Sequence, residues 1–480
     1  MPNFDGFVGG AYEAPSIYQD AQECINWYCE IDSTKKEGER GVIALYPTPG
    51  KILQFTFPDL LEVRGFYVLE GGLQMLAVCG PSLYLVNASL VATFIGSLLS
   101  FSGPVSISDN RIEALIVDGA NRYSYSIAAQ TLSVIASSDG AFVGGNVVDF
   151  ADGFFVYNQP NSNIWAASSP LGSDTPALSF GSKGSSPDNI VTIIADHREV
   201  LLIGEKTTEA WINVGAFPFP FQIIPGTSFQ HGCAAQWSLA RLGESTAWLA
   251  QDTRGQAVVV QMAGYQPKRI STHAVEVDIM NGVISDAIAY TYNQEGHEFY
   301  VLTFPTQDKT WCYDLATQLW HKRAERDNLN VLHRDSGNCH AIFQGMHLVG
   351  DFQNGNVYSL DLNTYTDNGA PILRMRRAPH MTVNLNRVFY DSLQIQFQPG
   401  VGIPSGQGSD PQAMLRWSDD GASTWSAYYP LPIGKIGQFK NRCIKRKMGF
   451  ARDRVYEVTI TDPVRAVIIS AEIEATAGSS

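Results

Sequence analysis

The sequence has little charge and no long apolar run. Only 17% of its 480 residues are charged, although 45% are hydrophobic. The stretch between Glu70 and Asp109 carries no charged residue, but Gly80-Pro81 and Gly103-Pro104 interrupt it. No apolar run reaches the roughly 18–20 residues that a membrane-spanning helix needs, and the N-terminus has no signal-peptide pattern. We expect no stable membrane insertion, and burial of this stretch in a β-core.

Cysteines are few and do not form a framework. The seven are scattered along the chain, and Cys24 and Cys29 form an isolated C-x4-C without a second pair at zinc-site spacing. We predict free, buried thiols in a reducing compartment, with no disulfide framework and no metal.

Signatures of catalysis are also missing. The chain contains no G-x-S-x-G elbow, no P-loop and no H-E-x-x-H, because His297-Glu298 lacks the second histidine. Asp361, Asn363 and Asp367 suggest calcium spacing but lack the loop glycine and the terminal glutamate. We therefore predict no catalytic residue and no cofactor.

The sequence also lacks a sustained apolar stripe with the 3.6-residue period of a helix. Glycine (43) and proline (24) are plentiful and aromatic residues reach 11%, which favours strands and turns over helices. The formal net charge of -14 repels nucleic acid. A solvated acidic surface explains this balance. It is also compatible with a wall past which DNA slides without sticking.

What the chain does contain is a β-repeat, best seen in Asp188–Asn213. Apolar strand-formers at Ile190–Ala195 and Val200–Ile203 flank a charged tetrad, Asp196–Glu199, and a third segment, Thr207–Ile212, follows. Short apolar runs separated by polar or glycine turns predict antiparallel hairpins. Comparable units occupy residues 71–87, 109–126, 151–168, 195–213, 242–263, 294–315 and 343–362.

This spacing predicts an all-β fold built on a β-propeller. The units lie roughly 40–50 residues apart, the period of four-stranded blades, and stacking blades around an axis buries both faces of each sheet. Seven blades are expected, or six if one unit belongs to the N-terminal arm. An irregular sandwich is the alternative.

The remaining segments predict two further parts. Residues 1–60 read as an N-terminal arm with strands, including a charged stretch, 32–40, expected to be an exposed loop. Residues 61–366 form the propeller and 367–480 a C-terminal antiparallel β-domain. In that domain, strands are expected at Met381–Asn386, Ser392–Gln398, Met414–Trp417, Val455–Thr461 and Val464–Ala471.

Several long motifs carry a family resemblance. They are DAQECINWYCE (20–30), ALYPTPG (44–50), SPDNIVTIIADHREVLLIGEKTTEAWIN (186–213), FPFPF (217–221), HGCAA (231–235), GYQPKRISTHAVE (264–276) and ISDAIAYTYNQEGHEFYVLTFP (284–305). Together they resemble the packaged-DNA stabilisation proteins of short-tailed bacteriophages, the tail hub or nozzle family. The resemblance spans most of residues 16–325 and weakens after about residue 330.

The resemblance implies a non-enzymatic virion protein made in the bacterial cytoplasm. It would form a ring of several copies, expected to be six, below the portal and its adaptor protein. The implied partners are further copies of the chain, the portal adaptor, the tail needle or plug, tailspike or fibre proteins, and double-stranded DNA passing without sequence-specific binding.

A second motif predicts a structural turn. Ser418, Asp420, Thr424 and Trp425 match the Asp-box pattern S-x-D-x-G-x-T-W, while Ala422 stands at the usual glycine position and Gly421 precedes it. The Asp420 carboxylate is expected to accept N–H groups of the turn while Trp425 packs beneath it.

The Asp-box also raises the main enzymatic alternative, a sialidase-like or carbohydrate-binding propeller on the virion surface. Arg374, Arg376 and Arg377 cluster in sequence, but alternating strand geometry sends neighbours to opposite faces. No ordered set of Arg, Glu and Tyr accompanies them. A third alternative is a free-standing cytoplasmic scaffold propeller.

One segment is basic against the acidic average. Lys435, Lys440, Arg442, Lys445, Arg446, Lys447, Arg452 and Arg454 fall within twenty residues. We interpret it as a candidate interface for an acidic partner subunit, with a solvated face and DNA contact as alternatives; few aromatic residues interleave for stacking on bases.

Overall fold

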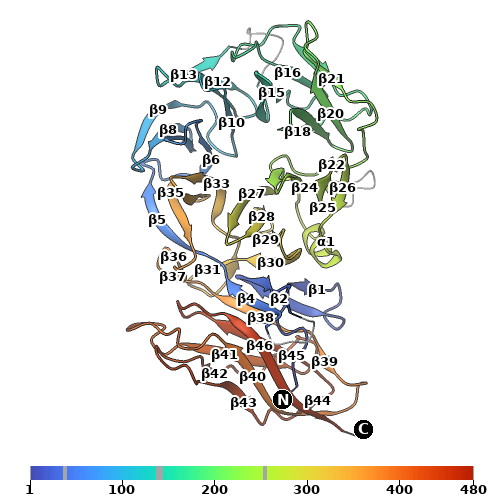
Figure 1. Ribbon diagram of the computed structural model, residues 1–480, viewed down its shortest axis with the longest axis vertical. Coiled ribbons are helices and arrows are strands. Elements are labelled where there is room, and N and C mark those ends of the chain that lie inside the picture. The colour runs from blue at the N-terminus through green and yellow to red at the C-terminus, as the bar shows by residue number, and fades with distance from the viewer. Residues whose placement is uncertain (1, 36–40, 137–143, 252–256, 479–480) are drawn as a thin grey trace.

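The computed structural model describes residues 2–35, 41–136, 144–251 and 257–478. It has two parts: a ring of small sheets, and below it a layered β-structure that contains the C-terminus (Figure 1). Residues 36–40 of the charged stretch expected to be a loop lie outside the described ranges.

The ring consists of seven blades, which confirms the predicted propeller. Blade 1 contains β6 (Val63–Val68), β7 (Gln74–Cys79), β8 (Ser82–Asn87) and β9 (Ala92–Ser97). Blade 2 contains β10 (Ser106–Asp109), β11 (Glu113–Val117), β12 (Arg122–Ser126) and β13 (Thr131–Ile135). Blade 3 contains β14 (Val148–Ala151), β15 (Phe154–Asn158), β16 (Ile164–Ala167) and β17 (Phe180–Ser182). Blade 4 contains β18 (Ile190–Asp196), β19 (Glu199–Gly204), β20 (Thr208–Asn213) and β21 (Phe221–Ile223).

The remaining blades are less regular. Blade 5 contains β22 (Gly232–Cys233), β23 (Ala240–Leu242), β24 (Ser245–Gln251), β25 (Ala257–Ala263) and β26 (Gln266–Arg269). Blade 6 contains β27 (Ile288–Gln294), β28 (His297–Phe304), β29 (Lys309–Asp314) and β30 (Leu319–Arg323). Blade 7 contains β33 (Gly337–Phe343), β34 (Met346–Asp351), β35 (Asn356–Asp361) and β5 (Gly50–Thr56), extended by β36 (Thr366–Asp367) and β37 (Ala370–Pro371). In the sequence, α1 (His273–Met280) lies between blades 5 and 6. The hairpin of β31 (Glu325–Arg326) and β32 (Leu332–His333) lies between blades 6 and 7.

Each repeat seen in the sequence supplies the two middle strands of one blade. The polar tetrad in blade 4 becomes the tight turn between β18 and β19, where His197 and Arg198 have φ of 46° and 68°. Two consecutive positive φ values are the requirement of a type I′ hairpin turn, which matches the twist of the flanking strands. Glu295 and Gly296, at 49° and 86°, repeat this geometry in blade 6.

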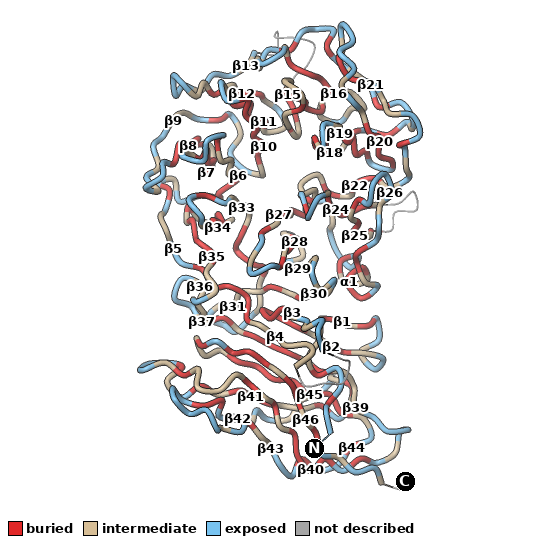
Figure 2. The backbone as a smooth tube through the Cα atoms, viewed as in Figure 1, coloured by how far each residue is buried: buried red, intermediate tan, exposed pale blue. Residues whose placement is uncertain are grey.

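Apolar side chains fill the spaces between blades. Leu76 and Val78 of blade 1 pack in one cluster with Ile116 and Tyr123 of blade 2, and all four are buried. Buried residues accordingly concentrate in the strands, while exposed residues lie at the outer turns (Figure 2). Each sheet thus covers its neighbour, as stacking around an axis requires.

An N-terminal strand closes the ring. β5 pairs antiparallel with β35 along Gly50–Thr56 and so provides the outer strand of blade 7. On the inner side of the ring, β33 of blade 7 contacts β6 of blade 1. The first and last blades are therefore held together by backbone hydrogen bonds between segments about 300 residues apart.

The layered part is a sandwich of two sheets. One contains β3 (Trp27–Ile31), β4 (Ile43–Pro47), β46 (Ile468–Ala477), β40 (Val388–Phe397), β43 (Cys443–Arg446) and β44 (Phe450–Ala451). The other contains β2 (Ala21–Ile25), β38 (Arg374–Arg377), β45 (Asp453–Ile460), β41 (Gln412–Ser418) and β42 (Tyr429–Pro432), with the short strands β1 (Tyr12–Glu13) and β39 (Met381–Thr382).

The core of the sandwich follows the predicted alternation. Leu393, Ile395 and Phe397 point inward from β40, against Tyr456 and Val458 of β45.

Two predicted strands of the sandwich differ in extent. The strand expected at Met381–Asn386 covers only Met381–Thr382, and the one expected at Val464–Ala471 begins at Ile468. Before Ile468 the backbone forms tight turns instead of a strand. The amide of Ala466 donates to the carbonyl of Val464, and the amide of Val467 donates to the carbonyl of Arg465.

One sheet runs through both parts of the molecule. Its order is β27-β28-β29-β30-β2-β38-β45-β41-β42, so blade 6 continues directly into the sandwich. β2 joins them: Ile25 pairs in parallel with Lys322 of β30 and antiparallel with Met375 of β38.

A row of alternating charges crosses this junction. Lys322 Nζ lies 2.9 Å from Glu23, Arg377 lies 3.2 Å from Glu23 and 3.0 Å from Glu457, and Arg416 lies 2.5 Å from Glu457. Most of these side chains are largely buried, and Glu457 is 1% exposed. The five residues come from five adjacent strands, so the ion pairs fix the register between propeller and sandwich.

We predict that ring closure depends on the glycine at the start of β5. A Cβ at Gly50 would lie 2.5 Å from the carbonyl oxygens of Thr364 and Thr366. Gly50→Ala should therefore lower the free energy of unfolding by about 2 kcal/mol, the cost typical of forced overpacking. Gly184→Ala is the control, because its nearest heavy atom is 3.9 Å away. Equal urea midpoints for the two variants would contradict the prediction.

We also predict that the charge row stabilises the junction through Glu457. Glu457→Gln leaves two largely buried guanidinium groups without their shared carboxylate, which should cost about 3 kcal/mol in urea unfolding. Asp410→Asn is the control, since it breaks an exposed pair with Lys435 that should contribute less than about 0.5 kcal/mol. A loss for Glu457→Gln no larger than the control's would exclude this role.

Candidate functional site

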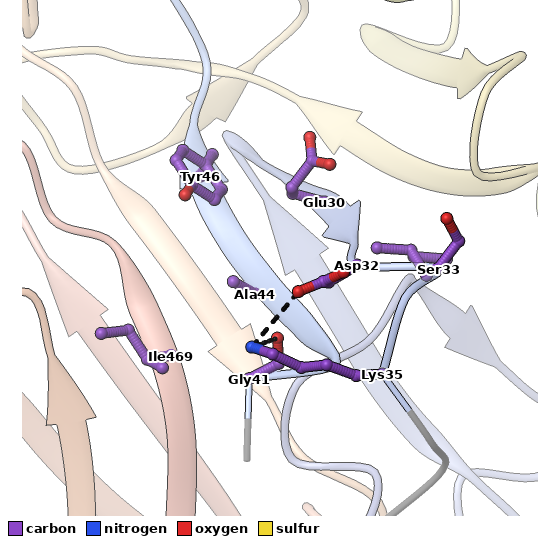
Figure 3. A pocket seen from close by; sticks show the side chains of 9 residues that line it. Glu30, Asp32, Ser33, Lys35, Gly41, Ala44, Tyr46 and Ile469 are labelled. Carbon is purple, nitrogen blue, oxygen red and sulfur yellow. Dashed lines mark hydrogen bonds and ion pairs between the residues drawn. The ribbon is translucent and has the colours of Figure 1, made fainter. Parts of the chain in front are cut away.

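A pocket lies between β3, β4 and β46 (Figure 3). Its volume is about 860 Å³, and its lining includes Glu30, Asp32 and Lys35. Asp32 accepts a 2.6 Å hydrogen bond from Thr34 and pairs with Lys35 at 3.3 Å. Glu30 lies 2.5 Å from His297. Both carboxylates therefore already have partners within the protein.

His297 links blade 6 to the N-terminal segment. Its Nδ1 lies 2.8 Å from Asp314 and its Nε2 lies 2.5 Å from Glu30 of β3. The hydrogen bond to Asp314, followed by that to Glu30, raises the pKa of His297 to about 9. The imidazole is therefore protonated at neutral pH, and it serves as a cationic bridge rather than as a general base.

Arg376 anchors the N-terminal segment from within the sandwich. The side chain is fully buried and donates to the carbonyl groups of Phe7 (2.7 Å), Gly10 (2.8 Å), Glu23 (3.3 Å) and Gly6 (2.8 Å), and to Gln22 Oε1 (2.6 Å). Five such bonds use the full donor capacity of a guanidinium group.

The three clustered arginines do not form a carboxylate-binding triad. Arg377 belongs to the charge row, Arg376 binds backbone carbonyls, and Arg374 is buried with no acceptor within the described chain. The three side chains lie in separate environments, so they do not form the arginine cluster with which a sialidase binds the carboxylate of its substrate.

The Asp-box-like segment forms a tight turn after β41. Asp420 accepts hydrogen bonds from the Thr424 amide (2.8 Å) and hydroxyl (2.6 Å), and one from the Ser418 hydroxyl (2.7 Å). The bonds from Thr424 contribute most to lowering the pKa of Asp420 to about 2. Gly421 has φ of 68°, and Ala422, which replaces the usual glycine, has φ of 71°.

Trp425 contacts the charge row. Its ring packs against the guanidinium groups of Arg416 (4.5 Å) and Arg377 (5.1 Å). The indole covers one end of the charge row and partly shields it from water.

The predicted basic segment is divided between surface and core. Lys435, Lys440, Arg442, Arg446, Lys447 and Arg452 are exposed, and Lys445 is half-buried over the ring of Tyr429 at 3.9 Å. Arg454 is 1% exposed and pairs with Asp419 at 2.5 Å, so it is not part of the basic surface. Arg454 lies over the ring of Tyr390 at 4.3 Å and donates to the carbonyl of Met448, contacts that the sequence pattern did not indicate.

The charge row and the Arg376 anchor were missed by sequence reasoning. Glu23 meets Lys322 and Arg377 only after the chain has returned over some 300 residues, as the sequence separation of 299 for the first pair indicates. No local spacing pattern marks such partners.

The described ranges can be compared with the sequence predictions on metal sites, membrane helices and cysteines. They hold no group of three or more His, Cys, Asp or Glu side chains suited to a metal ion. Across these ranges, no helix combines the length and the apolar character that crossing a membrane requires. All seven cysteines are free; six are buried and Cys339 is partly exposed.

Two protein-family models match the chain. One, described as "Bacteriophage P22 Gp10, beta-propeller", matches residues 71–365, and the other, "Bacteriophage P22 Gp10, beta-sandwich", matches residues 374–476. The chain is also similar to the solved WD40 β-propeller domain of Doa1, with 10% identity and a TM-score of 0.41, over 65% of this chain and 97% of that one. No curated protein sequence matches.

The family match agrees with the resemblance carried by the sequence motifs, and it covers both structural parts. Each matched range corresponds to one part of the fold, the ring of blades or the sandwich. The chain therefore belongs to the bacteriophage P22 Gp10 family, the packaged-DNA stabilisation or tail hub proteins.

Proposed function

We propose that this protein is the hub of a phage tail. In this proposal a ring of copies, six in number, sits below the portal adaptor, retains packaged DNA, lines the exit channel and holds the needle and the spikes or fibres. It is made in the host cytoplasm and has no enzymatic activity. The carrying observation is the family match over both propeller and sandwich.

The proposal includes the division of the chain into an arm (1–60), a propeller (61–366) and a C-terminal domain (367–480). Within the arm, β5 works as a strand of blade 7, and β2 works as the strand between the two larger parts. A rigid connection of this kind suits a part that must hold its shape against the pressure of packaged DNA.

Charge supports the proposed conduit. A net charge of -14 disfavours adhesion of DNA to the protein surface. The exposed basic side chains of residues 435–452 are the exception, and we assign them to contact with an acidic partner subunit. Within the Asp-box-like turn, we assign Ser418, Asp420, Gly421, Thr424 and Trp425 a structural role.

Assembly is the direct test of this proposal. Mixed with the portal adaptor, the purified full-length chain should form closed rings of six copies, seen by electron microscopy and by mass. The physical reason is that a tail ring must match the symmetric site on which it is mounted. A chain that stays monomeric and does not bind the adaptor would exclude the hub. Turnover of a host glycan by the monomer would instead favour the carbohydrate-active alternative.

The basic surface can be tested separately. The triple variant Lys440→Ser, Arg446→Ser, Lys447→Ser should weaken assembly at least tenfold at low salt, since charged interfaces chiefly raise the association rate. The loss should shrink as salt is raised, because exposed charges are screened. Lys268→Ser, on the exposed side of blade 5, is the control. Unchanged assembly of the triple variant would reject this surface as the interface.

A further inference from the structure

Two arginines of β38 offer a matched comparison. Arg374 and Arg376 are two residues apart on the same strand, and both side chains are fully buried. Arg376 makes five hydrogen bonds to the protein. By contrast, Nε, Nη1 and Nη2 of Arg374 have no acceptor anywhere in the described chain, and its one aromatic contact is the ring of Tyr365 at 5.6 Å.

A second guanidinium, on the other side of β2, is also incompletely bonded. Arg323 ends β30, and it lies 3.4 Å from Asp335 through Nη2, while its Nε and Nη1 lack acceptors among the described residues. The register of β2 places Arg323 and Arg374 on either side of Asn26, because Ile25 pairs with both Lys322 and Met375. Asn26 fixes this spacing by donating to the carbonyls of Ala324 (2.7 Å) and Leu373 (2.8 Å).

Charged side chains of both signs surround this point. The cations are Lys51, Arg323 and Arg374, of which Lys51 lies 3.0 Å from Asp335 and 2.5 Å from Glu325. These two carboxylates pair with Lys51 and Arg323, and Asp367 is the carboxylate whose charge acts on Arg374.

The remaining carboxylate nearby, Asp367, is a weak counter-ion. Burial, reinforced by Glu325 and Asp335 and opposed by Lys51 and Arg323, raises the pKa of Asp367 to about 7. Asp367 therefore takes up a proton more readily than an exposed aspartate, and its protonation removes the charge that acts on Arg374.

We propose that the junction binds one small inorganic anion, such as chloride, at the guanidinium group of Arg374. A buried cation without a counter-ion is strongly disfavoured, and a planar fork of N–H donors is suited to an anion. Water would satisfy the donors but would leave the charge unbalanced. The occupant is small and monovalent because the Arg374 side chain has no exposed surface and its guanidinium group carries one charge.

The first test is thermal unfolding of the full chain in sodium chloride against sodium gluconate at equal ionic strength. A bound anion stabilises the folded state by mass action, so chloride should raise the melting temperature saturably, by about 1–2 °C at ten times the dissociation constant. Arg374→Met should lose this response, whereas the control Arg446→Met, at an exposed position, should keep it. Equal curves in chloride and gluconate for the wild type would overturn the proposal.

The proposal also predicts how the response depends on pH. Asp367 competes with the anion when ionised, so chloride should bind more tightly at pH 6 than at pH 8. Asp367→Asn should bind chloride equally at both values. A response that is stronger at pH 8 in the wild type would contradict the site.

A second measurement does not depend on any variant. Wild-type crystals soaked in bromide should show an anomalous peak within hydrogen-bond distance of Arg374. Bromide peaks confined to the exposed basic side chains would exclude the site, even if Arg374→Met failed to fold.

Discussion

The structure depends on the fact that a β-strand has only two hydrogen-bonding edges. β2 uses one edge for β30 of the propeller and the other for β38 of the sandwich. The outer edge of blade 6 and the edge of the sandwich sheet are therefore both covered at this point, where they would otherwise be open to pairing with another chain. Propeller and sandwich thus share one sheet rather than a flexible linker.

The charge row follows from this shared sheet. Because β30, β2, β38, β45 and β41 lie side by side, Lys322, Glu23, Arg377, Glu457 and Arg416 come to alternate in sign across them. Each carboxylate lies between two cations, an arrangement that stabilises partly buried charges only when every member is present. The row makes the junction specific as well as stable.

The N-terminal segment holds the molecule together. It closes the ring through β5 and contacts blade 6 through the hydrogen bond between Glu30 and His297. Arg376 binds it by donating hydrogen bonds to the carbonyls of Phe7 and Gly10. These contacts join residues far apart in sequence, so forming them carries the entropic cost of closing long loops. Removing the segment would affect both parts at once.

Although the chain has few charged residues, several arginine side chains are fully buried. Arg64 is fully buried and donates to carbonyls of Gly80, Ser100, Ser102 and Gly103, which orders the loop between blades 1 and 2. Arg376 likewise donates to backbone carbonyls, in this case those of the N-terminal segment. Arg374 differs because none of the described residues accepts a hydrogen bond from it, and this contrast is the basis on which we propose an anion site at the junction.

The class of fold, the repeat and the family follow from local patterns in the sequence. Alternating apolar runs and turn residues such as His197 and Arg198 act over a few neighbours, so the repeat could be predicted, but the choice between six and seven blades required the structure. Only the tertiary structure decided that β5 closes the ring, that Arg454 turns inward to Asp419, and that Trp425 covers Arg416. These outcomes depend on pairings between distant strands, and a one-dimensional pattern holds no record of which distant residue will lie opposite.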